Sequence, residues 1–374
     1  KATEELNYNL EMINGAKHIH NLSTKWGDAP EISLEFSSKI GDLENPDDNY
    51  MFYHPQDICL DSNGNLYVLD TGNSRIQKFN VNLKYTLTIG SKGQGPGEFS
   101  YPGRLHIDNQ DVLYVYDRPL RRFQLFNSDG SPHGNFTPQM RYMSLQDRLS
   151  TGEFIIAAFL PYRFEKNESD EEVPLLQKLD PKGELIAGFG ERFEYNDPVA
   201  NTSCNSPGIA HDKNDNIYIS MAYQNRIEKY SPDGQLLFKS DRPLNYEVSL
   251  PKSNVDGGNV GFMENLHYVS GGIGIDHENR IWVLTYDRQE KEEEHLVIST
   301  LRAGPMMRTD VKGNTDLTET DMFKLEVFDN EGILLAEFPL GHFCDEIRVF
   351  NDKIYIIDTY RGMCIYEYKI IEMK

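Results

Sequence analysis

Apolar and polar residues of this 374-residue chain alternate in short runs, which are separated by turns rich in Asn, Asp and Gly. In residues 61–79, the turn Asp61-Ser-Asn-Gly64 precedes an apolar run at 66–69, and a second alternating run follows at 75–79. A period of two residues is typical of β-strands with one buried face. Less exact copies of this pattern begin at residues 108, 212, 276 and 351. Such copies, without helical periodicity, predict a radial array of small antiparallel sheets.

The repeats divide the chain into six expected blades of four strands each. The first blade is expected to have strands at 57–60, 65–69, 75–79 and 84–89. The next four blades are expected at 104–136, 143–189, 209–239 and 273–338. The last repeat has only three strands of its own, at 346–350, 353–358 and 363–370.

The fourth strand of the last blade is expected from the other end of the chain. Residues 31–40 alternate like a strand, and their ending Lys39-Ile-Gly41 matches Thr88-Ile-Gly90 at the end of the first blade. We expect this segment to pair with 363–370 and to close the ring, which leaves few exposed strand edges. The sequence thus predicts an all-β, six-bladed propeller over residues 31–374, with an N-terminal tether or extension at 1–30.

Three parts of the first repeat resemble the NHL repeat. They are the run Asn73-x-Arg75-Ile76-Gln77-x-Phe79, the preceding Gly64-Asn-Leu-Tyr-Val68 and the glycine-rich segment 90–99. From residue 31 to 370 the chain resembles the six-bladed, TolB-like propellers found as exported lipoproteins of Bacteroidetes. This resemblance implies the fold and an exported protein, in the periplasm or at the outer-membrane surface. Because the chain begins with Lys1 rather than Met, we expect that a leader has been removed and that any lipid anchor lies upstream.

The net charge of −22 argues against two classes of partner. Nucleic-acid backbones and anionic membrane surfaces both require clustered Lys and Arg. No apolar run approaches the roughly 18 residues of a membrane-spanning helix. The four cysteines follow no C-x-x-C pattern and are expected to be unpaired; they are Cys59, Cys204, Cys344 and Cys364.

The connections between the expected strands fall into two classes on opposite faces of the propeller. Turns within the first and second hairpins of each blade are short and rich in Asn, Asp and Gly. The connections between the hairpins and between blades carry long insertions, at 163–174, 191–206, 240–270 and 288–321. Loops longer than about 12–15 residues are usually functional. We therefore expect ligand binding on this second face, the long-loop face.

The channel mouth on the long-loop face is expected to be polar and mixed in charge. Aligning the first strands of the blades places Asp57, Arg104 and Glu346 at equivalent entry positions. Three further candidate ligand-binding residues lie just before them, His54, Tyr101 and His342. Aromatic residues on the long loops offer contact area for sugar rings or a protein partner; the candidates are Tyr162, Tyr195, Tyr246 and Tyr268.

Two functions are compatible with these features. The favoured one is a non-enzymatic propeller of the cell envelope that binds a glycan, a peptide or a partner protein. The alternative is a lyase or lactonase-type hydrolase with a divalent cation at the channel mouth, because six-bladed relatives include zinc-dependent amidating lyases and calcium-dependent lactonases. His54 and His342 are too few for a zinc site, and Asp57 and Glu346 are too few for calcium. We therefore expect no cofactor and no catalytic residue, and we expect Arg75, Arg122 and Arg226 to be structural.

Overall fold

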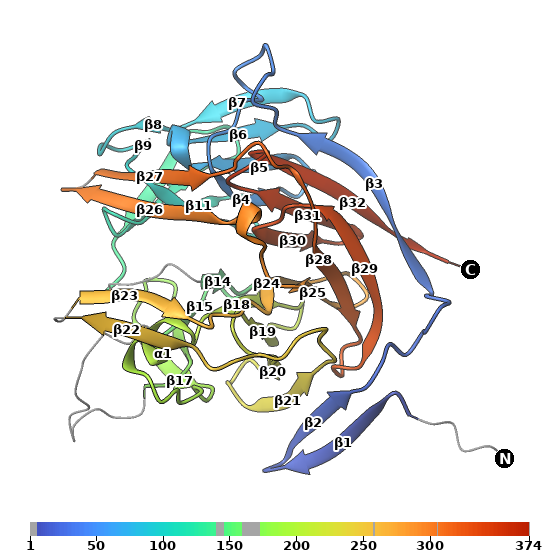
Figure 1. Cartoon of the computed structure of the whole chain (residues 1–374). Coiled ribbons are helices and arrows are strands. Elements are labelled where there is room, and N and C mark those ends of the chain that lie inside the picture. Colours follow the sequence, from blue (N-terminus) through green and yellow to red (C-terminus); the bar gives the residue numbers. More distant parts are fainter. Residues whose placement is uncertain (1–5, 140–145, 159–172, 257–258, 305, 374) are drawn as a thin grey trace.

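Six small antiparallel sheets stand in a ring and form a six-bladed propeller (Figure 1). The computed structural model describes residues 6–139, 146–158, 173–256, 259–304 and 306–373. Blades 1, 2 and 3 follow one another along the chain. Their strands are β4 (Pro55–Leu60), β5 (Leu66–Asp70), β6 (Arg75–Phe79) and β7 (Tyr85–Ile89); β10 (Pro102–Ile107), β11 (Leu113–Asp117), β12 (Arg122–Phe126) and β13 (Pro132–Phe136); and β14 (Gln146–Arg148), β15 (Phe154–Ala157), β16 (Leu176–Leu179) and β17 (Leu185–Phe189).

Blades 4, 5 and 6 complete the ring, and the last of them takes one strand from the N-terminal part of the chain. Their strands are β18 (Pro207–His211), β19 (Ile217–Met221), β20 (Ile227–Tyr230) and β21 (Leu236–Asp241); β24 (Ser270–Ile275), β25 (Ile281–Tyr286), β28 (Glu319–Phe328) and β29 (Leu334–His342); and β30 (Glu346–Phe350), β31 (Lys353–Asp358), β32 (Cys364–Glu372) and β3 (Ile32–Ile40). The six-bladed, all-β fold predicted from the sequence is confirmed.

The closure of the ring is also confirmed. Strand β3 pairs antiparallel with β32, in a register that runs from Ile32 opposite Glu372 to Ile40 opposite Ile365. The two strands come from opposite ends of the chain and lie side by side in Figure 1. Blade 6 therefore reaches the same four-stranded width as blades 1, 2 and 3.

The hydrophobic core lies between the blades rather than within any one sheet. Each pair of neighbouring blades shares one cluster of buried side chains, so the described residues form six such clusters around the ring. Between blades 1 and 2, for example, Tyr67 and Ile76 pack with Leu105 and Val115. Burying a side chain of this size stabilises the fold by about 1.5–3 kcal/mol, so each blade depends on both of its neighbours.

A hydrogen bond inside the inner hairpins of four blades explains the repeated sequence pattern. The Asp61 carboxylate accepts hydrogen bonds from the backbone N–H groups of Asn63 and Asn65, which closes the turn between β4 and β5. Its second oxygen accepts one from the buried Tyr67 hydroxyl, at 3.1 Å. The same bond recurs in blades 2, 4 and 5, as Tyr114–Asp108, Tyr218–Asp212 and Trp282–Asp276. The repeated residues therefore form a turn and a hydrogen bond that joins this turn to a buried side chain of the next strand.

The arginines at the start of the third strands join each blade to the connection that precedes it. Arg75 Nε lies 2.7 Å from the Asp70 carboxylate, and its Nη2 donates to the backbone oxygens of Asp48 and Met51. Arg122 and Arg226 make the corresponding bonds, to Gly95 and Glu98 and to Glu191. These contacts agree with the structural role expected for the three residues.

The N-terminal extension packs against the propeller. Strands β1 (Tyr8–Ile13) and β2 (Ala16–Asn21) form a hairpin, and β2 pairs parallel with β21, which widens blade 4 to six strands. The buried Asn21 side chain donates to Ser240 Oγ and accepts from the Leu334 N–H, so it joins blades 4 and 5. The segment expected to act as a tether is thus, over these residues, part of a sheet.

Two smaller features complete the description. The four cysteines are buried and unpaired, as expected. Within the described ranges, no helix has the length and apolar character needed to span a bilayer.

Deleting residues 1–41 removes β3, and it should lower the free energy of unfolding by more than about 4 kcal/mol or cause aggregation. The reason is that β32 becomes an exposed edge and the clusters beside blade 6 lose Ile32 and Ile40. Deleting only residues 1–30 keeps β3 and serves as the matched control, with a much smaller expected loss. Thermal and urea denaturation measure both variants, and equal stability of the two would contradict the closure.

Candidate functional site

The ordered insertions of the propeller lie on one face. This long-loop face carries α1 (Pro198–Ser203), the hairpin β22 (Lys252–Asp256)–β23 (Asn259–Glu264), the hairpin β26 (Leu296–Ala303)–β27 (Met306–Gly313) and the short pair β8 (Ser91–Lys92)–β9 (Glu98–Phe99). All of them appear on the left side of Figure 1. Two further elements are single turns of 3-10 helix, Thr71–Asn73 and Glu292–Glu294. The opposite face carries short turns closed by Asp side chains, such as Asp61, Asp180 and Asp329.

The three predicted mouth residues come together from blades 1, 2 and 6. Arg104 Nη1 lies 3.3 Å from Glu346 Oε2 and 3.8 Å from Asp57 Oδ2. A fourth residue, Arg348 of β30, completes the network: its Nε lies 2.8 Å from Asp57 Oδ1 and its Nη1 lies 3.2 Å from Glu346 Oε1. Arg348 was not among the candidates from the sequence, although it lies two residues after Glu346 and therefore on the same side of the strand.

The network holds Asp57 charged in a buried position. Burial raises the pKa of Asp57, but the charges of Arg348 and Arg104 outweigh it and the resulting pKa lies below the ordinary value. The backbone N–H of Leu105 in blade 2 also donates to this carboxylate, at 3.0 Å. Because each charge has a partner, these residues join three blades at the mouth and hold one another in place.

Glycines in blades 4 and 5 leave room beside this network. A Cβ on Gly272 would lie 2.5 Å from Glu346 Oε1, so a larger residue cannot stand there without displacing Glu346. Between Gly208, Arg104 and Arg348 lies a cavity of about 20 Å³, counted as space open to the centre of a water molecule. That is enough for one water molecule and too little for a larger ligand.

A second group of ionisable residues continues along the channel. Asp147 Oδ2 and His211 Nδ1 lie 2.7 Å apart. Burial favours the neutral form of both, but their mutual attraction dominates: the pKa of His211 is raised to about 9, and that of Asp147 is lowered to about 2. Burial lowers the pKa of the neighbouring His106 to about 4, so this imidazole stays neutral at pH 7.

Part of the mouth wall carries charges without an oppositely charged partner. Arg118 of blade 2 donates to the Gly103 carbonyl and lies over the Tyr101 ring, at 5.9 Å from its centre, but it has no carboxylate partner among the described residues. Burial and the nearby Arg104 lower the pKa of Arg118. These effects show that its charge is poorly solvated, which makes the site favourable for an added anion.

Asp345 is the corresponding acidic group on blade 6. Its carboxylate accepts a partly buried hydrogen bond from the Thr359 N–H at 2.7 Å, and no Lys or Arg in the described ranges forms an ion pair with it. Desolvation of this carboxylate and the charge of Asp358 raise its pKa to about 7, and the nearby Arg361 acts in the opposite direction. Burial and the nearby Asp345 raise the pKa of Tyr360 and the nearby Arg118 lowers it, so this hydroxyl lies near both charges.

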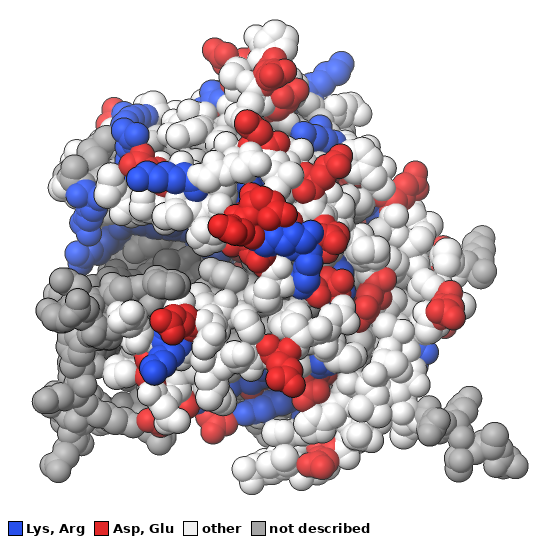
Figure 2. Space-filling model, in the orientation of Figure 1, with Lys and Arg blue, Asp and Glu red and all other residues white. Residues whose placement is uncertain are grey.

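A hairpin crosses the mouth above these residues. We call β26–β27 the strap: it rises from blade 5, and the Thr309 hydroxyl lies 2.5 Å from the Tyr101 hydroxyl of blade 2, on the opposite side of the ring. Arg361 of blade 6 donates to the Asn314 carbonyl at the base of the strap. In Figure 2 the surface is hollowed between the strap and β22–β23, and Lys and Arg side chains border the upper edge of this hollow.

The two candidate histidines do not converge. His54 has a positive φ of 51°, and its ring stacks on Tyr53 at 4.2 Å beside Tyr360. His342 lies elsewhere than the alignment suggested, because β29 continues to this residue and places it on an outer strand. There its Nε2 lies 2.9 Å from the Tyr368 hydroxyl, and its ring stacks on Tyr366 of blade 6.

The donor set at the mouth does not fit the metal sites considered from the sequence. Across the described ranges, no group of three or more His, Cys, Asp and Glu residues is arranged to hold a metal ion. The nearest carboxylates, Asp57 and Glu346, are already engaged by Arg104 and Arg348. These residues hold neither the three or four ligands of zinc nor the six to eight oxygens of calcium.

The candidate aromatic residues differ in accessibility. Tyr268 is 39% exposed and stacks on Tyr286 at 5.3 Å between their ring centres. Tyr246 donates its hydroxyl to the carbonyls of Tyr268 and Tyr286. Tyr195 is buried and accepts a hydrogen bond from Gln224. Tyr162 lies outside the described residues.

The fold and the repeated turns define a six-bladed propeller of the NHL type, and comparison with known proteins gives its family. A family model described as a 6-bladed beta-propeller (DUF5128) matches residues 42–249, more than half of the chain. The chain therefore belongs to this family. The resemblance to NHL-repeat and TolB-like propellers is thereby confirmed.

Curated relatives match only parts of the chain. NHL repeat-containing protein 3 from Homo sapiens is 27% identical over 115 residues, which are 30% of this chain and 32% of that protein. Peptidylglycine alpha-amidating monooxygenase from Rattus norvegicus is 25% identical over 210 residues, which are 54% of this chain and 20% of that protein. The matches thus span about a third or less of these relatives.

Solved structures match nearly the whole propeller. A member of the DUF4221 family from Bacteroides vulgatus has a TM-score of 0.59 at 12% identity, covering 92% of this chain and 99% of that one. A putative exported protein from Bacteroides fragilis has a TM-score of 0.53 at 11% identity, covering 91% and 96%. At these identities the likeness concerns the fold alone.

The pair Asp147–His211 predicts a stability change at alkaline pH. Its stabilisation is complete below the ordinary His pKa of 6.5 and is lost as the pH rises through about 9, because the folded state holds the His211 proton more tightly than the unfolded chain. Between about pH 6 and 10, the wild type should lose about 1–3 kcal/mol more than His211→Gln. Urea denaturation measures this difference, and parallel pH curves for the two proteins would contradict it.

Proposed function

We propose that this protein is a non-enzymatic binding propeller of the cell envelope. Its ligand is a glycan, a peptide or a segment of a partner protein, held on the long-loop face at the channel mouth. The observation that carries the proposal is that Arg118 and Asp345 both lie near Tyr360 and that neither forms an ion pair within the described residues. A folded protein usually pairs its desolvated charges, so unpaired ones are candidates for ligand contacts.

Arg118 and Asp345 recognise different chemical groups of the ligand. Arg118 offers N–H donors to a carboxylate, phosphate or other acceptor-rich group, and such charge-assisted bonds are about twice as strong as neutral ones. Asp345, with a pKa of about 7, accepts hydrogen bonds from hydroxyl or ammonium groups when ionised and donates one when protonated. The half-buried Tyr360 near both groups supplies apolar contact area. A polar ligand is thereby oriented as well as held.

The network of Asp57, Arg104, Glu346 and Arg348 supports the same site from below. Its members are mutually paired, and they form the floor of the mouth. Ligand contacts with this floor are expected at the outer oxygens of Glu346, whose side chain is 19% exposed, rather than at Asp57, at 1%. The strap covers part of the site, so the ligand enters beside it.

The location in the cell envelope has separate support. The resemblance to exported lipoprotein propellers suggests it, and one structural neighbour is described as a putative exported protein. A lipid anchor upstream of the given residues belongs to the same proposal. The donor set at the mouth gives no specific support to the lyase or lactonase alternative.

The substitution Arg118→Gln tests the proposed site. Wild type and variant are applied to arrays of bacterial surface glycans and of peptides, and the affinity for each bound ligand is then measured in solution. We expect at least a 10-fold loss for Arg118→Gln, because about 1.4 kcal/mol or more of charge-assisted hydrogen bonding is removed. Arg121→Gln is the matched control, since Arg121 is exposed on the same loop and carries the same charge. Array ligands that bind both variants as tightly as the wild type would overturn the assignment.

A further inference from the structure

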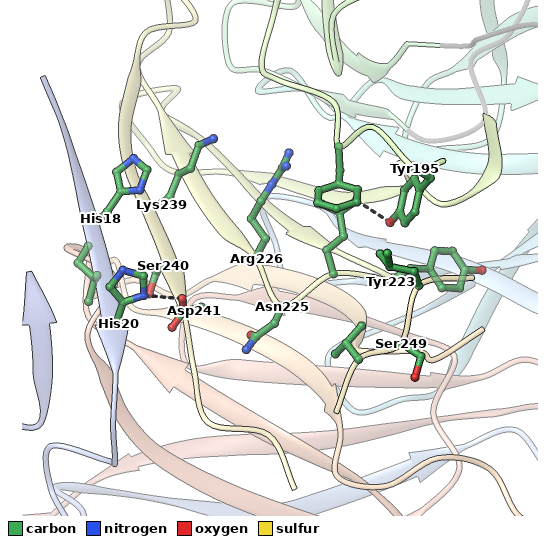
Figure 3. A pocket seen from close by; sticks show the side chains of 15 residues that line it. His18, His20, Tyr195, Tyr223, Asn225, Arg226, Lys239, Ser240, Asp241 and Ser249 are labelled. Atoms are coloured by element: carbon green, nitrogen blue, oxygen red, sulfur yellow. Dashed lines mark hydrogen bonds and ion pairs between the residues drawn. The ribbon is translucent and has the colours of Figure 1, made fainter. Parts of the chain in front are cut away.

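A second cavity, of about 370 Å³, lies at the outer side of blade 4 (Figure 3). It is bordered by β2, by the end of β21, by the connection after β19 and by the two long connections that flank blade 4. Its volume is within the range of small-molecule sites. Every residue that lines it belongs to the described part of the chain, and none belongs to the ionic network at the mouth.

The N-terminal hairpin builds one wall of this cavity. Because β2 pairs parallel with β21, His18 lies opposite Lys239 and His20 opposite Asp241, with alternate residues on the same face of the sheet. Ile19, between the two histidines, is buried in the core shared by blades 4 and 5. In Figure 3 the side chains of His18, Lys239 and Arg226 point in the same direction. Within the described residues, blade 4 is the one blade widened by such a hairpin.

The opposite wall is apolar. Phe193 and Leu250 come from the two long connections and are 41% and 59% exposed. Phe193 packs edge to face against Tyr195, with 4.8 Å between the ring centres, and Tyr223 lies beside them. Two large exposed apolar side chains beside one cavity indicate a surface that an apolar body can cover.

The polar wall combines basic side chains with carboxylates that are already paired. Glu228 is fully buried and already engaged by Arg226, Lys239 and the Tyr230 hydroxyl. Asp241 is paired with His20 at 2.7 Å.

The remaining groups can donate hydrogen bonds. The His18 side chain makes no hydrogen bond within the described residues, and Arg226 uses its Nη2 and Nε, which leaves Nη1 available. Lys239 also contacts Glu191, at 3.0 Å, but the Glu191 side chain is 78% exposed. Because the Glu191 carboxylate is solvated and weakly held, the carboxylate of a ligand can replace it beside Lys239.

We infer that this cavity binds an organic carboxylate, with the anionic group at His18, Lys239 and Arg226 and an apolar body against Phe193 and Leu250. The site is independent of the proposed site at the mouth. A peptide C-terminus with an apolar side chain and a fatty acid both carry this chemistry, whereas a uronic acid carries the carboxylate on a hydroxylated ring. The relative affinities of small probes identify which source fits.

Calorimetric titration of the full chain tests the inference. The probes are N-acetyl-L-leucine, octanoate and D-glucuronate, and their neutral counterparts are N-acetyl-L-leucinamide, octanamide and D-glucose. We expect at least one acid to bind at least 10-fold more tightly than its neutral counterpart. Neutral probes that bind as well as the acids would overturn the inference, as would the absence of binding by all three acids at about 10 mM.

Matched variants locate the binding. His18→Leu and Phe193→Ala should each weaken binding of the best acid at least 5-fold, because they remove a donor and part of the apolar wall. Lys17→Gln is the control on the same strand, since Lys17 points to the other face and pairs with Glu331. Arg118→Gln should leave this affinity unchanged, which separates the cavity from the mouth. An affinity that falls in Lys17→Gln or Arg118→Gln but not in His18→Leu would contradict the location.

Discussion

The pairing of β3 with β32 is the interaction on which the rest of the structure depends. A propeller blade buries both of its faces against neighbours, so an open ring would leave two blades with exposed apolar surfaces. In this chain the seam lies between blades 6 and 1, where Tyr355 and Ile357 pack with Ile58 and Val68. Strand β3 completes blade 6 and is followed in the chain by β4 of blade 1. The ring is therefore closed without any additional connecting segment.

The same seam determines what stands at the channel mouth. Arg348 of blade 6 reaches across it to Asp57 of blade 1, and the Thr359 hydroxyl donates across it to the Pro55 carbonyl at 2.8 Å. Charged residues from blades 6, 1 and 2 thus meet where the first and last blades join. The uncompensated Asp345 and Arg118 stand on either side of this joint, so the proposed ligand site depends on the closure that stabilises the fold.

The sequence predicts those features that repeat with the blade. The turn Asp and its aromatic partner mark the inner hairpins of blades 1, 2, 4 and 5, and equivalent strand positions bring Asp57, Arg104 and Glu346 together. Features set by contacts between distant segments were missed, namely the pairing of the N-terminal hairpin with β21 and the extension of β29 to His342. Arg118 could have been found from the repeat pattern. It directly follows the Asp that ends the second strand of its blade, and at the equivalent position blades 1 and 6 have Thr71 and Thr359.

Hydrogen–deuterium exchange, with and without a ligand identified on the glycan or peptide arrays, tests the central claim most directly. The account predicts slower exchange at the mouth and on the connections of the long-loop face, above all near Arg118, Asp345 and the strap. Ordering on that face is expected because its long insertions have the most conformational freedom to lose. Protection confined to the short Asp-closed turns of the opposite face would contradict the account.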